Sequence, residues 1–308
     1  MDRHVIGVAI GGTKTTIIYA KLDGFKIVST EKKLFPTDSL NPDKTIEKIY
    51  SSIDSFPQDF DLISIICGSP LDVKNGLICS PSNLPGWKDI PIVKLLENKY
   101  KVKSTLLNDG DACALAEYHY GIGKGTNNFI YIIIGTGFGS GLILNGKLYT
   151  GSSYNAGEVG HVKVSDNGYL PRNKKIGSAE GFISGGGIGD IASLLVKDDK
   201  ESSLNKYEII TAKDVFAEAR NGDKLSLKIV DQAATKLGEI VSMYLDILNP
   251  DMIAIGGLYI RGIDLLEKKT LKVVKENSLP QSYNFAKIVP AILEKDIDEY
   301  SSLMGIYL

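Results

Sequence analysis

The chain has 308 residues, of which 43% are hydrophobic and 23% charged, and its 35 Lys and Arg against 37 Asp and Glu give a net charge of −2. This length favours about two domains, and the balanced charge gives no general attraction to nucleic acid or anionic lipid. No stretch approaches the ~20 apolar residues of a membrane span, and no signal peptide is recognisable. We therefore expect a cytoplasmic, globular protein that binds a small molecule, with neither a nucleic acid nor a membrane as partner.

The N-terminal part begins with a strand, a glycine turn and a second strand. Residues 4–10 form a run rich in β-branched side chains, which breaks at Gly11-Gly12 and resumes over 15–20. The pattern predicts two strands joined by a tight turn.

A βαβ pattern follows this pair of strands. A helix that we expect Asp43 to cap precedes the continuous apolar run 61–67, which is typical of a buried strand. Another short strand, 104–107, leads into a helix over 109–120. Between them, residues 68–87 are rich in proline and glycine and are expected to be irregular. The strands should be parallel, and the ends of parallel strands are where α/β proteins collect their sites.

The strand, glycine turn and strand pattern occurs a second time further along the chain. Strand 129–134 breaks into the glycine-rich segment 135–141 and resumes over 142–145. We infer two lobes built on one plan, each offering a glycine turn.

The C-terminal part combines helices with one more strand. A long amphipathic helix is expected to begin at Asp223 and to end at Pro250. The strand 252–255 runs into Gly256-Gly257, and residues 297–308 are expected to form a closing helix.

The first glycine turn has the composition of a phosphate-binding turn. Gly11 and Gly12 let the backbone approach an anion, and Thr13 and Lys14 add a hydroxyl and a cation. An ordinary hairpin turn explains this fragment about equally well. A Walker A loop is excluded, because Thr13 stands where the lysine must be and a strand follows.

The second glycine segment, Gly135-Thr-Gly-Phe-Gly-Ser-Gly141, places glycines at alternate positions after a strand. Such a run has a low propensity for β-strand but suits a backbone that wraps around phosphate oxygens. It lacks the G-x-G-x-x-G spacing of a dinucleotide site. We expect a second phosphate-binding loop here.

Asn108-Asp109 lies where a strand gives way to a helix. A carboxylate there can accept a proton from a hydroxyl while the start of the helix keeps it ionised, so Asp109 is our candidate general base. The alternative, which local sequence alone favours, is that Asp109 only caps the helix.

Taken together, these segments resemble the ROK family, which comprises sugar kinases and related repressors of the actin-like ATPase superfamily. The resemblance covers nearly the whole chain and is carried, in order, by GGTK (11–14), NDGDACALAE (108–117), GTGFGSG (135–141), GEVGH (157–161) and NPDMIAIGG (249–257). It implies an α/β fold of two ribonuclease-H-like lobes with a central cleft. The smaller lobe would comprise residues 1–120 joined by 297–308, and the larger, nucleotide-binding lobe residues 121–296.

The resemblance also implies an activity and the residues that perform it. The expected reaction transfers the γ-phosphate of ATP, with Mg²⁺, to a hydroxyl of a hexose such as glucose or of an N-acetylhexosamine, O6 being the leading expectation, and Asp109 is the base. The implied nucleotide contacts are Gly11, Gly12, Thr13, Lys14, Gly135, Thr136, Gly137, Gly139, Gly256 and Gly257. The implied sugar contacts are Gly68, Asn83, Asn108, Asp109, Glu158, His161 and Glu180. We expect Trp87, in the segment that resembles the family's sugar loop, to be core.

The chain departs from the family pattern at two places. Zinc-containing members carry C-x-C-G-x-x-G-C-x-E, and aligning Glu180 with the final Glu puts Pro171, Asn173 and Ser178 at the cysteine positions. We therefore expect no structural zinc, with Glu180 oriented by packing and hydrogen bonds instead. The second departure is Ala9, where typical members have an Asp that helps to hold Mg²⁺. We expect weaker metal binding, with Mg²⁺ carried mainly by the nucleotide phosphates.

Two other functional classes were weighed against the kinase. A repressor of this family carries a DNA-binding domain before the first glycine turn, and only nine residues precede Ile10, which makes this class the weaker expectation. A sugar-binding pseudokinase or sensor with weak or no turnover is the alternative that Ala9 motivates. Because dimers are common in the family, we also expect a homodimer.

Overall fold

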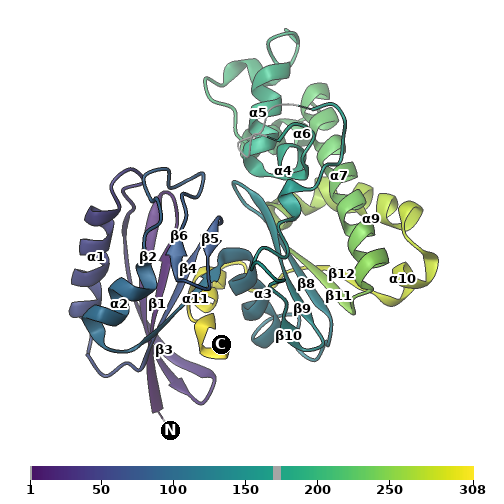
Figure 1. Cartoon of the computed structure of the whole chain (residues 1–308). Coiled ribbons are helices and arrows are strands. Elements are labelled where there is room, and N and C mark those ends of the chain that lie inside the picture. The colour runs from purple at the N-terminus through teal and green to yellow at the C-terminus, as the bar shows by residue number, and fades with distance from the viewer. Residues whose placement is uncertain (1, 169–174) are drawn as a thin grey trace. The chain divides into compact units, whose positions relative to one another are not determined.

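The computed structural model describes residues 2–168 and 175–308, and the chain divides into two compact units (Figure 1). The first unit runs to Tyr120 and adds Thr150–Asn155 and Lys295–Leu308. The second unit comprises Gly121–Tyr149 and Ala156–Glu294. The sequence pattern assigned residues 150–155 to the larger lobe, whereas the structure places this short segment in the first unit.

The first unit is built on a five-stranded sheet with the strand order β3-β2-β1-β4-β7. The strands are β1 (Asp2–Ile10), β2 (Lys14–Asp23), β3 (Lys26–Pro36), β4 (Leu62–Cys67) and β7 (Lys103–Asn108). β1, β2 and β3 pair antiparallel, whereas β1, β4 and β7 pair parallel. The predicted strands and their parallel arrangement are therefore confirmed, and β3 is an additional edge strand.

The remaining elements of the first unit refine the predicted boundaries. They are α1 (Pro42–Asp54), β5 (Leu71–Asp72), β6 (Leu77–Ile78), α2 (Ile92–Tyr100), α3 (Asp109–His119), α11 (Ile297–Ser302) and the 3-10 helix η3 (Met304–Tyr307). The expectation that Asp43 caps α1 is wrong, since the N-cap is Asn41 and the helix begins at Pro42, which has the helical φ and needs no N–H in the first turn. The expected closing helix is wrong in its length, since α11 ends at Ser302 and a 3-10 turn follows.

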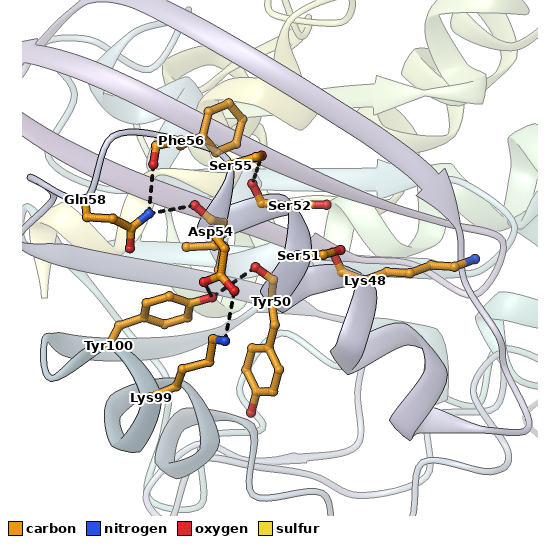
Figure 2. Close-up of polar contacts among 11 residues, drawn as sticks. Lys48, Tyr50, Ser51, Ser52, Asp54, Ser55, Phe56, Gln58, Lys99 and Tyr100 are labelled. Carbon is orange, nitrogen blue, oxygen red and sulfur yellow. Dashed lines mark hydrogen bonds and ion pairs between the residues drawn. The ribbon is translucent and has the colours of Figure 1, made fainter.

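Helices α1 and α2 are joined by polar contacts at the end of α1, which Figure 2 shows. Asp54 accepts hydrogen bonds from Lys99 Nζ and from Tyr100 Oη, both at 2.9 Å. The Lys99 ammonium group lowers the pKa of the Asp54 carboxyl. Beneath these contacts, Ile49 and Ile53 are buried in a core that also contains Trp87, so the expectation that Trp87 is core is confirmed.

The second unit repeats the plan of the first. Its sheet has the order β10-β9-β8-β11-β12, with β8 (Phe129–Ile134), β9 (Phe138–Leu144), β10 (Lys147–Leu148), β11 (Met252–Gly257) and β12 (Lys287–Pro290). The first strand is again central, antiparallel partners lie on one side, and parallel partners lie on the other. The inference of two lobes on one plan is confirmed.

Helices cover the sheet of the second unit and bury its main core. They are η1 (Val159–His161), α4 (Ala179–Ile183), α5 (Gly185–Leu195), η2 (Ser203–Lys206), α6 (Ala212–Arg220), α7 (Lys224–Leu248), α8 (Leu258–Arg261), α9 (Ile263–Asn277) and α10 (Pro280–Phe285). Asp223 caps α7 as predicted, its side chain accepting from Ser226 N at 2.8 Å. None of the helices described has the length and apolarity that crossing a membrane requires.

Candidate active site

Three predicted site segments lie at one edge of the sheet in the first unit. Ile10, Cys67 and Asn108 are register partners on β1, β4 and β7, and each is the last residue of its strand. Because these strands are parallel, the residues that follow them, Gly11, Gly68 and Asp109, leave the sheet at the same carboxyl edge. The first glycine turn, Gly68 and the candidate base thus meet at this edge.

The first glycine turn is closed tightly. Gly11 N donates to Lys14 O at 3.0 Å. Gly12 is packed against Asn83, because a Cβ added at Gly12 would lie only 2.7 Å from the Asn83 Cβ and carbonyl oxygen. Asn83, a predicted sugar contact, is therefore adjacent to the turn.

The cation of the turn has a partner that the sequence did not reveal. Lys14 Nζ lies 2.9 Å from Asp298 Oδ2 on α11, and both side chains are more than half exposed. An exposed pair of this kind contributes little to stability, so Lys14 can turn to another anion at small cost.

Asp109 is the first residue of α3, and the N-cap is Asn108. Asn108 Oδ1 accepts from Gly110 N at 2.8 Å, and Asn108 Nδ2 donates to Ser69 Oγ at 2.7 Å. The capping position thus belongs to Asn108, although Asp109 Oδ1 also accepts from Gly110 N at 2.8 Å. Asp109 is exposed, and a Cβ added at Gly68 would lie 3.6 Å from its Oδ2. The Asp109 carboxylate is therefore exposed at the carboxyl edge of the sheet.

The second glycine turn is shorter than the sequence predicted. β9 already begins at Phe138, and Gly139 and Gly141 pair with Ile133 and Tyr131 of β8. The expectation that the whole glycine-rich run forms a loop is wrong, because the register of the hairpin outweighs the low strand propensity of glycine. The turn itself is Gly135-Thr136-Gly137, so Gly139 lies in a strand.

Helix α5 fixes the backbone of this second turn. Gly185 N donates to Gly135 O at 2.9 Å, and Gly186 N donates to Thr136 O at 3.1 Å. These N–H groups belong to the first turn of α5, where backbone N–H groups have no acceptor within the helix. These contacts of Gly185 and Gly186 were not predicted, although the run of three glycines at 185–187, after Glu180, is a signal that could have indicated them.

Gly256 and Gly257 lie beside the second turn. They are register partners of Ile133 and Ile134 on the parallel strand β8, so Gly257 is level with the residue that precedes Gly135. Gly257 has φ +69°, and a Cβ there would lie 2.3 Å from Ile134 O. Glycine is therefore required at this position, both for the backbone conformation and for the close approach to Ile134 O.

The predicted sugar contacts of the second unit lie on segments close to the second glycine turn and the start of β9. Glu158 immediately precedes η1, which ends at His161, and His161 N donates to Glu158 O at 3.1 Å. Glu180, on α4, has its Oε2 3.3 Å from Phe138 N. Gly68, Asn83, Asn108 and Asp109 belong to the first unit.

Backbone hydrogen bonds fix the segment that precedes Glu180. Val164 N donates to Gly177 O and Ala179 N donates to Val162 O, both at 2.8 Å. Pro171 and Asn173, at two of the aligned cysteine positions, lie outside the described residues, whereas Ser178 is a buried bridge partner of Lys163. In the part of the chain that the structure describes, no three His, Cys, Asp or Glu side chains are grouped to hold a metal ion. Backbone pairing therefore joins the segments that carry His161 and Glu180.

Comparisons with known proteins identify the family. A family model described as ROK matches residues 5–306. A glucokinase of Halalkalibacterium halodurans is 33% identical over 96% of this chain and 92% of its own length. A glucokinase of Thermotoga maritima is 29% identical over 95% of this chain and 93% of its own. A xylose repressor of Caldicellulosiruptor bescii is 27% identical over 78% of this chain and 61% of its own length.

The fold agrees with these matches. The crystal structure of a ROK hexokinase from Thermus thermophilus has a TM-score of 0.84 to this chain at 24% identity, over 99% of this chain and 98% of that one. This likeness confirms the expected fold of two ribonuclease-H-like lobes. The family match, which spans nearly all of the described chain, confirms the resemblance seen in the motifs, and the chain belongs to the ROK family.

Proposed function

We propose that this ROK-family member is an ATP-dependent kinase that phosphorylates a hydroxyl of a hexose such as glucose or of an N-acetylhexosamine, with O6 as the preferred position. The observation that carries the proposal is Asp109, an exposed carboxylate at the same sheet edge as the first glycine turn. The 33% identity to a glucokinase over almost the whole chain supports the class of substrate.

In this reaction the sugar hydroxyl oxygen bonds to the γ-phosphorus as the bond from phosphorus to the β,γ-bridging oxygen breaks. The hydroxyl proton passes to Asp109, and ADP leaves with the bridging oxygen. Phosphoryl transfer needs positioning and charge neutralisation more than covalent chemistry from the protein. Each glycine turn has backbone N–H groups that suit phosphate oxygens, and Lys14 adds positive charge at the first turn.

The proposed sugar contacts suit a polyhydroxylated substrate. Glu158 and Glu180 accept hydrogen bonds from hydroxyl groups, and His161 is exposed and able to donate or accept one. Asn108 Oδ1 has one bond to Gly110 N, and an amide oxygen has room for a second donor. Gly68 and Asn83 complete the set proposed for the first unit.

Mg²⁺ supplies charge neutralisation when it enters with ATP. The oxygens near the first turn include the Thr13 hydroxyl, the Asp109 carboxylate at the same sheet edge and the Asp298 carboxylate that pairs with Lys14, while the Ala9 side chain on β1 offers none. This donor set fits an ion that is held mainly by the nucleotide and by water.

Replacing Ala9 by Asp should lower the Mg²⁺ concentration needed for half-maximal rate several-fold, because a hard carboxylate is added next to the first turn. The measurement is the initial rate against Mg²⁺ at saturating ATP and sugar. Ala9→Asn is the matched control, since it has nearly the same shape without the charge and should leave the requirement as in the wild type. An unchanged requirement in Ala9→Asp would place the ion elsewhere.

The test of the function is ADP release measured with a panel of hexoses and N-acetylhexosamines at several Mg²⁺ concentrations. We expect release to be stimulated strongly by at least one sugar. If no sugar stimulates release at any Mg²⁺ concentration, the kinase proposal fails. A sugar that then still raised the melting temperature would support the sugar-binding sensor that Ala9 motivates.

A further inference from the structure

The carboxylate of Glu180 lies against the second glycine turn of the same unit. Its Oε2 accepts a hydrogen bond from Phe138 N at 3.3 Å. A Cβ added at Gly137 would lie 3.0 Å from that same oxygen. A carboxylate oxygen therefore lies beside the turn to which the proposed function assigns a phosphate.

Backbone hydrogen bonds hold the turn around this carboxylate, whereas the carboxylate is carried by a flexible side chain. The carbonyls of Gly135 and Thr136 accept from the first turn of α5, and Gly135 N donates to Gly137 O at 3.0 Å. At Gly135 an added Cβ would meet nothing within 4 Å, so this face of the turn is open. Glu180 is half-buried and has three side-chain torsions, which allow its carboxylate to leave the turn without moving α4.

The position of Glu180 affects anion binding in two ways. A carboxylate this close repels a phosphate oxygen, because both are negative and solvent screens them incompletely. It also uses the Phe138 N–H, a donor that could otherwise face the phosphate. Both effects weaken nucleotide binding as long as Glu180 stays on the turn.

We propose that Glu180 makes nucleotide binding depend on the sugar. This inference rests on the proposed function, in which Glu180 accepts hydrogen bonds from sugar hydroxyls. A bound sugar draws the carboxylate from the turn, which frees the Phe138 N–H and removes the repulsion. Sugar then tightens the binding of ATP, and by thermodynamic linkage ATP tightens the binding of sugar by the same factor. This coupling also limits the hydrolysis of ATP when no sugar is bound.

The test measures the affinity of a non-hydrolysable ATP analogue by calorimetry, with and without glucose as the probe sugar. In Glu180→Gln the side chain keeps its shape and an oxygen that can accept from Phe138 N, but the charge is gone. We expect the sugar-free affinity of this variant to exceed the wild-type value by about tenfold, within the usual range of coupling between sites. In this variant the ratio of the analogue's affinity with glucose to its affinity without glucose should fall towards one.

Glu276→Gln is the matched control, because it makes the same change at an exposed position of α9, in the same unit, that is not among the proposed contacts. Its sugar-free affinity for the analogue should equal that of the wild type. Equal sugar-free affinities in wild type and Glu180→Gln would overturn the inference, and this arm needs no sugar at all. If sugar stimulates ADP release by the wild type while the sugar-free affinities of wild type and Glu180→Gln are equal, the kinase proposal stands and only the role of Glu180 in coupling is wrong. If no sugar stimulates release, the proposed function itself fails.

Discussion

Asp109→Asn should bind sugar nearly as well as the wild type but should lose about 10²- to 10⁴-fold in kcat, the range that general-base catalysis contributes. The amide keeps the shape of the side chain and can still accept from Gly110 N, as Asp109 Oδ1 does at 2.8 Å. It cannot take the proton of the attacking hydroxyl. The measurement is kcat and KM for sugar by ADP release, with sugar affinity measured separately by calorimetry.

A second Asp→Asn change in the same unit provides the control. Asp23 lies at the far end of β2 from the glycine turn, since β2 runs from Lys14 to Asp23. Asp23→Asn should keep the wild-type kcat while making the same change in charge. If Asp109→Asn turned over at the wild-type rate, another group would have to be the base.

Gly257→Ala should lower the free energy of unfolding by about 2–5 kcal/mol and raise the KM for ATP. Two costs combine in this variant. A non-glycine residue is strained at φ +69°, and the new Cβ would be 2.3 Å from Ile134 O, beside the second glycine turn. Displacing that strand end moves Gly135 as well. Urea denaturation gives the stability, and initial rates give the KM.

Gly222→Ala separates the two costs. Gly222 has φ +88°, but an added Cβ would meet nothing within 4 Å. This variant has the backbone strain without the close contact, so it should lose less stability, about 1–3 kcal/mol, and keep the wild-type KM for ATP. Equal losses of stability in Gly257→Ala and Gly222→Ala would show that the new Cβ at position 257 makes no costly contact with Ile134 O. An unchanged KM in Gly257→Ala would remove Gly257 from the nucleotide site.

The sequence predicted the parts of the fold whose patterns are continuous. The strand over 129–134 is all apolar and matches β8, and the long helix from Asp223 has the expected cap and stripe. β3 was missed because it is an edge strand on which charged side chains face solvent. α5 was missed because its first turn is glycine, which has low helix propensity, and packing decides its conformation instead.

The candidate site shows the same division between local and distant contacts. The first glycine turn and Asp109 were predictable in position because they follow strands of one sheet, and parallel register brings the ends of those strands to one edge. The partners of these residues were not predictable. Asp298 contacts Lys14 across 284 positions of the chain, and Glu180 contacts Phe138 across 42. No local pattern carries information about such pairs.

The most direct test of the account is to identify the product. The purified protein is incubated with ATP, Mg²⁺ and the sugar that best stimulates ADP release, and the sugar is analysed by mass spectrometry and ³¹P NMR. The account predicts one sugar monophosphate, carrying the phosphate as an ester on a single hydroxyl, formed in equal amount to ADP by the wild type and at a greatly reduced rate by Asp109→Asn. ADP formed together with free phosphate and unchanged sugar would contradict it.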